Sequence, residues 1–215
     1  MKDKPGTDSR REGLILILSA PSGTGKTTLI SRLLALFPDI TLSVSYTTRA
    51  PRADEVPGRD YHFVSRAQFA RMRAAGEFAE WAKVHDFFYG TPRRLLDRAV
   101  RSGRDVLLDI DVQGAKQIKK RYPGAAVSVF LAPPSWPELR RRLAARGTDD
   151  RQVIARRMAN AKREIEAIVG YDYCVVNREV KTALAQLAAI IRAERLKVGR
   201  VLRWRIGPLR GALKR

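Results

Sequence analysis

The stretch that most constrains the fold is an apolar run followed by a glycine-rich loop and an amphipathic segment. It reads LILILSAPSGTGKTTLISRLLALF over residues 14–37. The run at 14–19 predicts a buried strand, and apolar residues at helical spacing over 27–37 predict a helix. The sequence S-G-T-G-K-T between a strand and a helix is typical of a phosphate-binding loop, G-x-x-x-x-G-K-[ST]. Ala20 replaces the leading glycine of that pattern, at a position where a small residue suffices.

The loop residues are suited to bind the phosphates of a nucleotide. Gly23 and Gly25 carry no Cβ, so their backbone N–H groups can approach phosphate oxygens. Lys26 is expected to bridge the outer phosphates, and the Thr27 hydroxyl to ligate Mg²⁺. We therefore expect Mg²⁺ as the cofactor, with ATP as co-substrate. The expected ATP-binding loop comprises Ala20, Pro21, Ser22, Gly23, Thr24, Gly25, Lys26, Thr27 and Thr28. A glycine-rich turn without a ligand is the alternative.

The rest of the chain alternates apolar runs with helical patterns. The runs at 106–112, 126–133 and 173–177 predict buried strands. Helical patterns cover 115–121, 136–146, 150–168 and 180–198. Strands that alternate with helices favour a parallel sheet covered on both faces. The segment 41–91 breaks this rhythm, with a helical stretch at 65–76, and is expected to form an inserted lobe.

Size, charge and cysteine content limit the class of protein. With 215 residues, 45% of them apolar, the chain can bury one substantial core. The net charge of +20 calls for a negatively charged partner, and residues 192–215 hold nine Lys or Arg against one acid, Glu194. That basic tail could contact RNA or an acidic surface, or remain solvated.

The single cysteine, Cys174, is expected to be a buried thiol, which fits a reducing cytoplasm. No apolar run is long enough to span a membrane.

Two carboxylates end the apolar run VLLDID. Asp109 and Asp111 lie at the carboxyl end of a predicted strand, where parallel sheets meet their ligands. Residues two apart on a strand share a face, so both carboxylates can point into one cleft, and one can orient magnesium through water. The alternative is that they cap the helix that follows.

Several further motifs give the chain a family resemblance. They are T-T-R-A-P-R with G-R-D-Y-H-F within 47–63, E-W-A-K-V at 80–84, Y-G-T-P at 89–92 and L-D-I-D-V-Q-G at 108–114. Together with the phosphate loop, they closely resemble guanylate kinase, in order and at plausible spacing from Leu14 to Leu196. The segment HDFFYGT departs from the more usual H-G-N-Y-Y-G-T of that family.

The resemblance implies an acceptor site for GMP. Arg49 and Arg52 offer forked cations beside Tyr61 and Tyr89, and forked cations suit a phosphate monoester. Guanine presents N–H donors at N1 and N2, so a carboxylate such as Glu80 can recognise it. The GMP-binding residues implied by the resemblance are Ser45, Arg49, Arg52, Tyr61, Glu80, Tyr89, Thr91, Asp109 and Asp111. Packing roles are the alternatives for the two tyrosines, Ser45 and Thr91, and solvated surface roles for Arg49, Arg52 and Glu80.

A second implied site is an arginine-bearing lid over ATP. Arg142 and Arg146 lie one helical turn apart, and Arg157 follows the break at Gly147. Such arginines stabilise charge on the transferring phosphoryl group, although arginine-rich helices are often merely solvated. The resemblance also places Asn177 near the adenine. The catalytic residues expected are Lys26, Arg49, Arg142, Arg146 and Arg157.

These features predict an α/β protein with a P-loop NTPase fold, an inserted GMP-binding lobe at about 45–95 and a small helical lid at about 140–160. We expect a flexible extension at 1–12, the kinase domain at 13–198 and a basic tail at 199–215. The expected reaction is ATP-dependent phosphorylation of GMP, and of dGMP, in the cytoplasm. A membrane is not expected as a partner, nucleic acid is left open by the tail, and so is a homo-oligomer.

Three other functions fit parts of the pattern. A kinase acting on a ribose bisphosphate would leave Glu80, Ser45 and Asp111 without a base to bind. A catalytically silent protein-binding module would not need Lys26 and Thr27. A nucleic-acid-dependent ATPase would need a polynucleotide to stimulate turnover.

Overall fold

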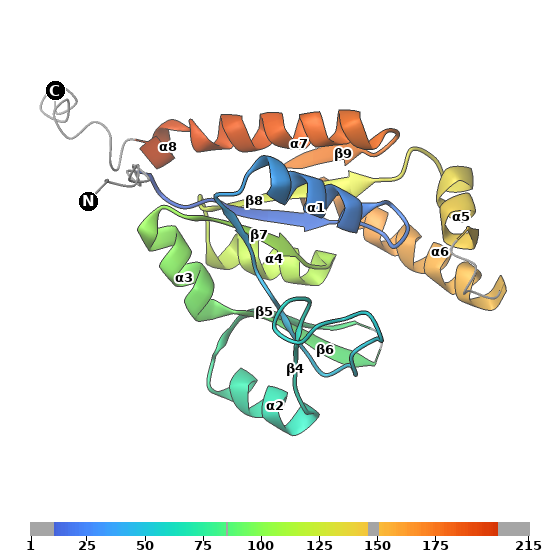
Figure 1. Cartoon of the computed structure of the whole chain (residues 1–215), viewed down its shortest axis with the longest axis horizontal. Coiled ribbons are helices and arrows are strands. Elements are labelled where there is room, and N and C mark those ends of the chain that lie inside the picture. Colours follow the sequence, from blue (N-terminus) through green and yellow to red (C-terminus); the bar gives the residue numbers. More distant parts are fainter. Residues whose placement is uncertain (1–10, 85, 146–150, 202–215) are drawn as a thin grey trace, which may run out of the picture.

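The computed structural model describes residues 11–84, 86–145 and 151–201, and its centre is a five-stranded parallel sheet (Figure 1). The strand order is β2-β7-β1-β8-β9. The strands are β1 (Ile15–Ser19), β2 (Ile40–Leu42), β7 (Asp105–Asp109), β8 (Ala126–Ala132) and β9 (Tyr173–Val176). Four of them were predicted, whereas three-residue β2 is too short to give a periodic signal. The strand predicted over 106–112 ends earlier, at Asp109, because Asp111 already caps the next helix.

Helices cover both faces of this sheet, as expected. In Figure 1, α1 (Lys26–Leu36) and α7 (Val180–Arg195) lie on one face, and α3 (Arg93–Ser102) and α4 (Val112–Arg121) on the other. Alternate residues of β1 serve the two layers, since Leu16 packs with α1 and α7 while Ile17 packs with α3 and α4. A strand buried on both faces reads as a continuous apolar run. Helix α3 was not among the predicted helices, because four arginines dilute its apolar pattern.

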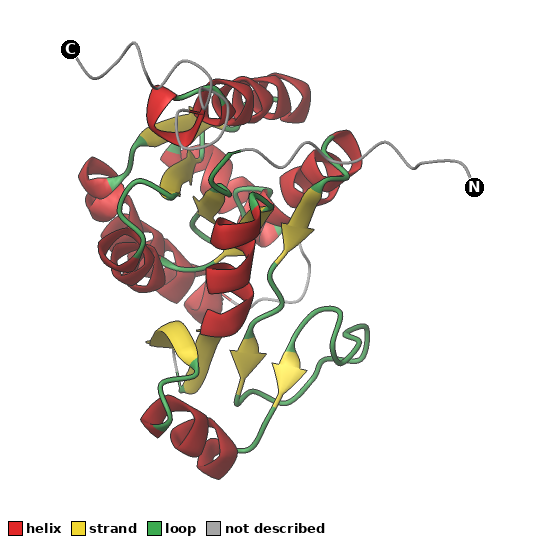
Figure 2. Ribbon diagram, turned by 90° about the vertical axis from the view of Figure 1, so that its left-hand side faces the viewer, coloured by secondary structure: helices red, strands yellow, loops and turns green. Residues whose placement is uncertain are grey.

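The inserted lobe is a second, four-stranded sheet with one helix, and it lies below the core in Figure 2. Its elements are β3 (Tyr46–Thr47), β4 (His62–Phe63), α2 (Arg66–Ala74), β5 (Phe78–Val84) and β6 (Phe87–Pro92). Phe69 of α2 stacks on Phe78 and Phe88, with ring centroids 4.6 and 5.5 Å away. This small aromatic core holds the lobe together.

A helical pair forms the third part of the molecule. It consists of α5 (Trp136–Ala144) and α6 (Arg151–Glu166), which a short 3₁₀ helix, η1 (Ala167–Gly170), follows. Leu139, Leu143 and Ala161 form a separate small core between the two helices. In Figure 1 the pair lies at the end of the molecule away from both termini.

The expected terminal segments lie mostly outside the described residues, but their described ends contact the core. Arg11 donates two hydrogen bonds of 2.6 Å to the buried Asp105 carboxylate. The chain ends its described part in α8 (Val198–Val201), where the buried Arg200 donates to the carbonyl oxygen of Ala125 at 3.1 Å. The side chains of Arg11 and Arg200 therefore attach these two ends to the core of the molecule.

The expectation of a buried thiol is wrong. Cys174 is exposed, because β9 is an edge strand and only Val175 and the partly buried Tyr173 face α7. Among the described residues, no helix combines the length and apolar composition that a membrane crossing needs.

Candidate active site

A cavity of about 230 Å³ lies between the carboxyl ends of β1 and β7 and the inserted lobe. Ligands of open parallel sheets bind at this edge. The core contributes Ser19, Ala20, Lys26, Asp109, Ile110, Asp111 and Val112 to its wall. The lobe contributes Ser45, Tyr61, Glu80, Ala82, Val84 and Tyr89, and α6 contributes Glu164. The cavity thus joins residues from all three parts of the molecule.

The phosphate loop is held in shape by its own hydrogen bonds and by Asn177, the residue after β9. Thr24 is fully buried, and its hydroxyl donates to the carbonyl oxygen of Pro21 at 2.8 Å. The side-chain amide of Asn177 donates to the carbonyl oxygen of Thr24 at 2.6 Å. Gly25 has φ +86°, and a Cβ there would lie 2.8 Å from that amide nitrogen. A glycine is therefore required where the loop enters α1.

The charged end of the loop faces the sheet edge. Lys26, the first residue of α1, forms an ion pair of 2.5 Å with Asp109 at the end of β7. Thr27 follows with an exposed side chain. Gly23, Gly25, Thr28, Arg142 and Asn177 line a second cavity, of about 310 Å³, on the other side of the loop.

Glu80 is the most unusual acid of the cavity. It lies on β5 with 4% of its surface exposed, and it accepts a 2.6 Å hydrogen bond from the hydroxyl of the buried Thr91. Burial raises the pKa of Glu80 to about 7, against the opposite effect of the Thr91 hydrogen bond, and the nearby charge of Asp111 adds to the rise. At neutral pH this carboxyl group is therefore poised to ionise when hydrogen-bond donors enter the cavity.

Asp111 acts both as a helix cap and as part of the cavity wall. Its carboxylate accepts a hydrogen bond from the backbone N–H of Gly114 at 2.9 Å and caps α4. It also lines the cavity together with Asp109. The two carboxylates share the cavity although only Asp109 belongs to the strand.

Of the lobe's two arginines, Arg49 lies beside the two tyrosines, with its guanidinium carbon 5.5 Å from the centroid of the Tyr61 ring, whereas Arg52 faces another cavity. Tyr61 and Tyr89 line the central cavity, with ring centroids 5.9 Å apart, and burial raises the pKa of Tyr61 to about 12. The Arg49 guanidinium also forms an ion pair of 2.7 Å with Glu55, a hydrogen-bonded partner that raises the arginine's pKa. Arg52 is exposed and lines a neighbouring cavity of about 270 Å³.

The two described lid arginines line two different cavities next to the phosphate loop. Arg142 of α5 forms an ion pair of 2.7 Å with Glu138 and donates to the carbonyl oxygen of Asn177 at 3.2 Å. Arg157 of α6 lines the cavity of about 270 Å³ together with Ser22 and Arg52. Arg146 lies outside the described residues.

Two residues of the site were missed by sequence reasoning. Glu164 of α6 lines both the central cavity and the one with Arg157, and burial raises its pKa to about 7. Its position seven residues after Arg157, on the same helix face, was the available signal. Gly114 leaves room for the carboxylate of Glu80, because a Cβ at Gly114 would lie 2.7 Å from Oε2.

The oxygen atoms near the phosphate loop are too few to bind a divalent cation alone, but they can do so together with the phosphates of a bound nucleotide. Within the described ranges, no group of three or more His, Cys, Asp or Glu residues could hold a metal ion. The exposed Thr27 hydroxyl and the Asp109 carboxylate are oxygen donors, the kind that Mg²⁺ prefers. Mg²⁺ commonly binds through one or two such residues plus substrate phosphates, which fits this arrangement.

Comparison with known proteins gives a consistent result. The family model described as guanylate kinase matches residues 12–194. A guanylate kinase of Geobacter metallireducens is 50% identical over 90% of this chain and 95% of its own length. One from Nitratidesulfovibrio vulgaris is 52% identical over 86% of this chain and 89% of its own. A crystal structure of guanylate kinase from Anaplasma phagocytophilum superposes with a TM-score of 0.76 at 38% identity, over 90% of this chain and 92% of that one.

Proposed function

Because this chain belongs to the guanylate kinase family and transfers a phosphoryl group from ATP to GMP, giving ADP and GDP, we propose that the central cavity is where the transfer occurs. One observation carries this assignment: Lys26 of the phosphate loop and Glu80 of the inserted lobe line the same cavity. A donor-phosphate residue and a base-recognising carboxylate thus face a common space. We extend the proposal to dGMP as acceptor and to the cytoplasm as the place of action.

Guanine recognition is assigned to the buried end of the cavity. Glu80, as a carboxylate, accepts hydrogen bonds from the N1 and N2 donors of guanine, and Asp111 is the second acceptor. Ser45 lies near O6, while Thr91 holds Glu80 in place through its 2.6 Å hydrogen bond. Adenine lacks this donor edge, so it would leave buried acceptors unpaired.

The acceptor phosphate is assigned to the lobe's cations and hydroxyls. Tyr61 and Tyr89 already line the cavity, whereas Arg49 is paired with Glu55 and Arg52 faces the adjoining cavity. An incoming phosphate competes with the Glu55 carboxylate for the Arg49 guanidinium. Binding of GMP therefore includes a change of partner at Arg49.

The chemical step is assigned to positioning and charge neutralisation. An oxygen of the GMP phosphate attacks the γ-phosphorus of ATP, and the bond from that phosphorus to the β,γ-bridging oxygen breaks, so ADP leaves with the electron pair. When ATP binds, the Lys26 ammonium group exchanges its ion pair with Asp109 for contacts with the phosphates of ATP. Arg142, Arg146 and Arg157 neutralise the developing charge from the lid side. Asn177 and the loop residues 20–28 hold ATP.

The Thr27 hydroxyl, with Asp109 through water, would hold Mg²⁺ when the phosphates of ATP are bound. The ion supplies charge neutralisation of the β- and γ-phosphate oxygens. No step beyond that is required of it, because the cations of the loop and lid complete the neutralisation.

The assignment is tested by a coupled ADP-release assay with ATP and Mg²⁺. The acceptors offered are GMP, dGMP, AMP, a ribose bisphosphate, single-stranded RNA or none. Turnover is expected with GMP and dGMP alone. A Glu80→Gln variant is expected to lose the preference of GMP over AMP while keeping ATP binding. Turnover stimulated by RNA or by ribose bisphosphate, but not by GMP, would contradict the proposal.

A further inference from the structure

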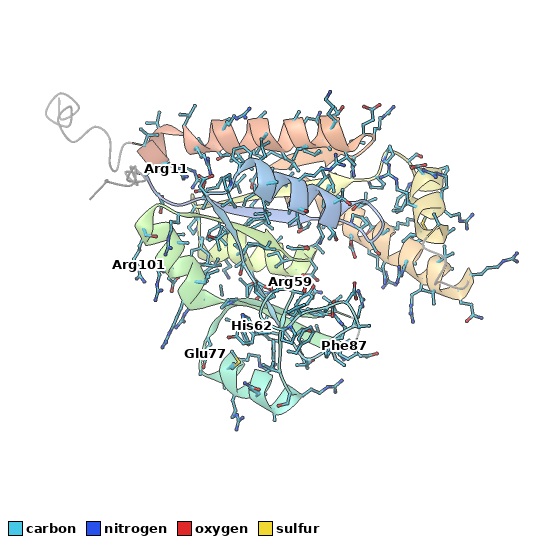
Figure 3. The ribbon with its side chains drawn as sticks, viewed as in Figure 1. Arg11, Arg59, His62, Glu77, Phe87 and Arg101 are labelled. Atoms are coloured by element: carbon cyan, nitrogen blue, oxygen red, sulfur yellow. The ribbon has the colours of Figure 1, made fainter. Side chains whose placement is uncertain are left out.

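Helix α3 carries a stripe of arginines on its outer side. Arg94, Arg98 and Arg101 stand at positions i, i+4 and i+7, and all three are exposed, opposite the fully buried Leu96. Arg104 follows the helix and is exposed as well. Figure 3 labels Arg101 on the outer edge of the molecule, on the side of the two termini. None of these residues lines the cavity where GMP is proposed to bind.

No acid among the described residues neutralises the stripe. In the part of the chain that the structure describes, Arg94, Arg98 and Arg101 form no ion pair or side-chain hydrogen bond, and the Arg104 side chain donates one hydrogen bond, to the Ser102 hydroxyl at 3.1 Å. The one acid of α3, Asp97, accepts from the Tyr122 hydroxyl at 2.7 Å and lies 4.0 Å from Arg93. A row of unpaired guanidinium groups remains available for an external anion.

A groove runs beside the stripe. It encloses about 360 Å³ between α3 and the edge strand β2, and Arg94, Arg98 and Arg104 form its rim. Leu95, Ala99 and Val106 give it an apolar floor, and Leu95 is 36% exposed. Cations around an apolar floor suit a ligand that combines a flat, weakly polar part with negative charges. An unpaired nucleobase on its phosphodiester backbone is such a ligand.

The basic C-terminal sequence begins close to the same place. The backbone N–H of Gly13 donates to the carbonyl oxygen of Val100 in α3 at 3.1 Å, and that of Glu12 donates to the carbonyl oxygen of Arg200 in α8 at 3.4 Å. Residues 12 and 13 therefore connect the end of α3 to the end of α8. Beyond Val201, residues 202–215 contain five Lys or Arg and no acid.

We propose that the α3 face binds single-stranded RNA, an activity distinct from GMP phosphorylation. The stripe is linear, with about one helical turn, ~5.4 Å, between neighbouring arginines, so it suits a chain of phosphates better than one compact anion. A duplex offers no unpaired base for the groove. The arginines contact phosphates, so binding depends on salt, and the apolar groove floor accepts any unpaired base, so binding depends little on sequence.

The test measures fluorescence anisotropy of a labelled single-stranded RNA 12-mer with the full chain over a range of salt concentrations. The site variant is Arg94→Glu with Arg98→Glu. The matched control is Arg32→Glu with Lys181→Glu, which makes the same charge change at exposed positions of α1 and α7 on the opposite face of the sheet. The site variant is expected to weaken binding by more than about tenfold near 0.1 M salt and to reduce the salt slope by about 1.4, which is two single-strand phosphate contacts. The control should change affinity by less than about threefold, since one face alone contacts the RNA.

Guanylate kinase activity reports folding in both variants and is expected to stay at the wild-type level. A milder pair, Arg94→Gln with Arg98→Gln, keeps the proposal testable if the glutamate variant does not fold. Equal weakening by site and control variants would overturn the proposal, because binding would then follow net charge. It would also be overturned if duplex RNA, poly-glutamate or anionic lipid vesicles bound as tightly as the single strand.

Discussion

The phosphate loop and the inserted lobe hold their ligand groups by opposite means. The loop is one contiguous stretch, residues 20–28, that presents backbone N–H groups and the start of a helix. The lobe presents side chains from separate segments, among them Ser45, Tyr61, Glu80 and Tyr89. A backbone site depends on chain conformation and tolerates changes in most side chains. A side-chain site depends on the identity and charge of each group.

The difference also has an energetic side. The loop satisfies its own polar groups, as with Thr24 and Pro21. The lobe keeps the carboxyl group of Glu80 buried, with its pKa near 7 rather than the usual 4.5. Ionising that group in the empty cavity costs up to about 3 kcal/mol, the equivalent of that shift. The Glu80 carboxylate that is proposed to bind guanine is therefore unfavourable in the empty cavity and becomes favourable when the base donates hydrogen bonds to it.

The largest effect is expected from Lys26→Ala. Loss of the only loop side chain proposed to reach the transferring phosphate should lower kcat by about 10²–10³-fold, as removal of one preorganised charge-stabilising group does elsewhere. GMP affinity should change little, because Lys26 belongs to the donor side. Steady-state kinetics with Arg32→Ala as the control checks this, and a kcat within tenfold of wild type would contradict the role of Lys26.

The next effect concerns pH and Glu80. GMP binds the carboxylate form, so its dissociation constant should rise about tenfold for each pH unit below pH 7, with uptake of GMP releasing about one proton at pH 6. Calorimetry in two buffers of different ionisation enthalpy measures the proton release, and Glu80→Gln should release about one proton fewer than the wild type at pH 6. ATP binding should show no such release from this group.

The same shift predicts a change in stability. The folded pKa of Glu80 lies above the unfolded value, so its contribution to the free energy of unfolding is full below about pH 4.5 and is lost as pH rises toward 7. Glu80→Gln should therefore stabilise the empty protein at pH 8, by at most about 3 kcal/mol, and have a smaller effect at pH 5. Urea unfolding at both pH values tests the sign, and destabilisation at pH 8 would contradict it.

A smaller effect is expected from Gly114→Ala. The new methyl group would meet the Glu80 carboxylate at 2.7 Å and displace it, so GMP affinity should fall by about tenfold, the scale of one charged hydrogen bond. Ala115→Gly, one residue along α4, is the control for altered helix propensity. Unchanged GMP affinity in Gly114→Ala would show that Glu80 does not need this position.

The smallest effect is expected from Ala20→Gly, which restores the usual loop pattern. Ala20 directly follows β1, whereas the positive-φ glycines of the loop are Gly23 and Gly25. Its replacement should change kcat and the KM for ATP by less than about twofold, because the loop backbone already has its working conformation. A larger gain would show that the loop is limited by its first residue.

The sequence predicted what depends on contiguous residues and missed what depends on contacts between segments. The strand, loop and helix at 14–37 are predictable because the apolar run, the glycine-rich motif and the helical spacing of apolar residues follow one another directly in the sequence. The lobe's strands β3 and β4 have two residues each, too few for any period to show. Gly114 and Glu164 acquire their meaning only when α4 meets β5 and α6 meets the cavity.

Two further predictions differ from the structure because the position of the residue in the fold, rather than its sequence neighbours, decides its role. Asp111 carries the two-residue spacing of a strand pair, yet β7 ends at Asp109 and Asp111 caps α4 while still lining the cavity. Cys174 lies in an apolar run, yet the run forms an edge strand with one uncovered side. Local sequence cannot distinguish an edge from a centre in a sheet whose order is set by the whole chain.

The central claim is that guanine is read by Glu80 while the phosphate loop holds ATP independently. The most direct test is the binding of GMP and of ATP, each alone, to Glu80→Gln by calorimetry at pH 7.5. The account predicts that GMP affinity falls by about 10²-fold, the cost of a lost charged acceptor for two donors, while ATP affinity stays within about twofold. An equal loss for both nucleotides, or an unchanged GMP affinity, would contradict it.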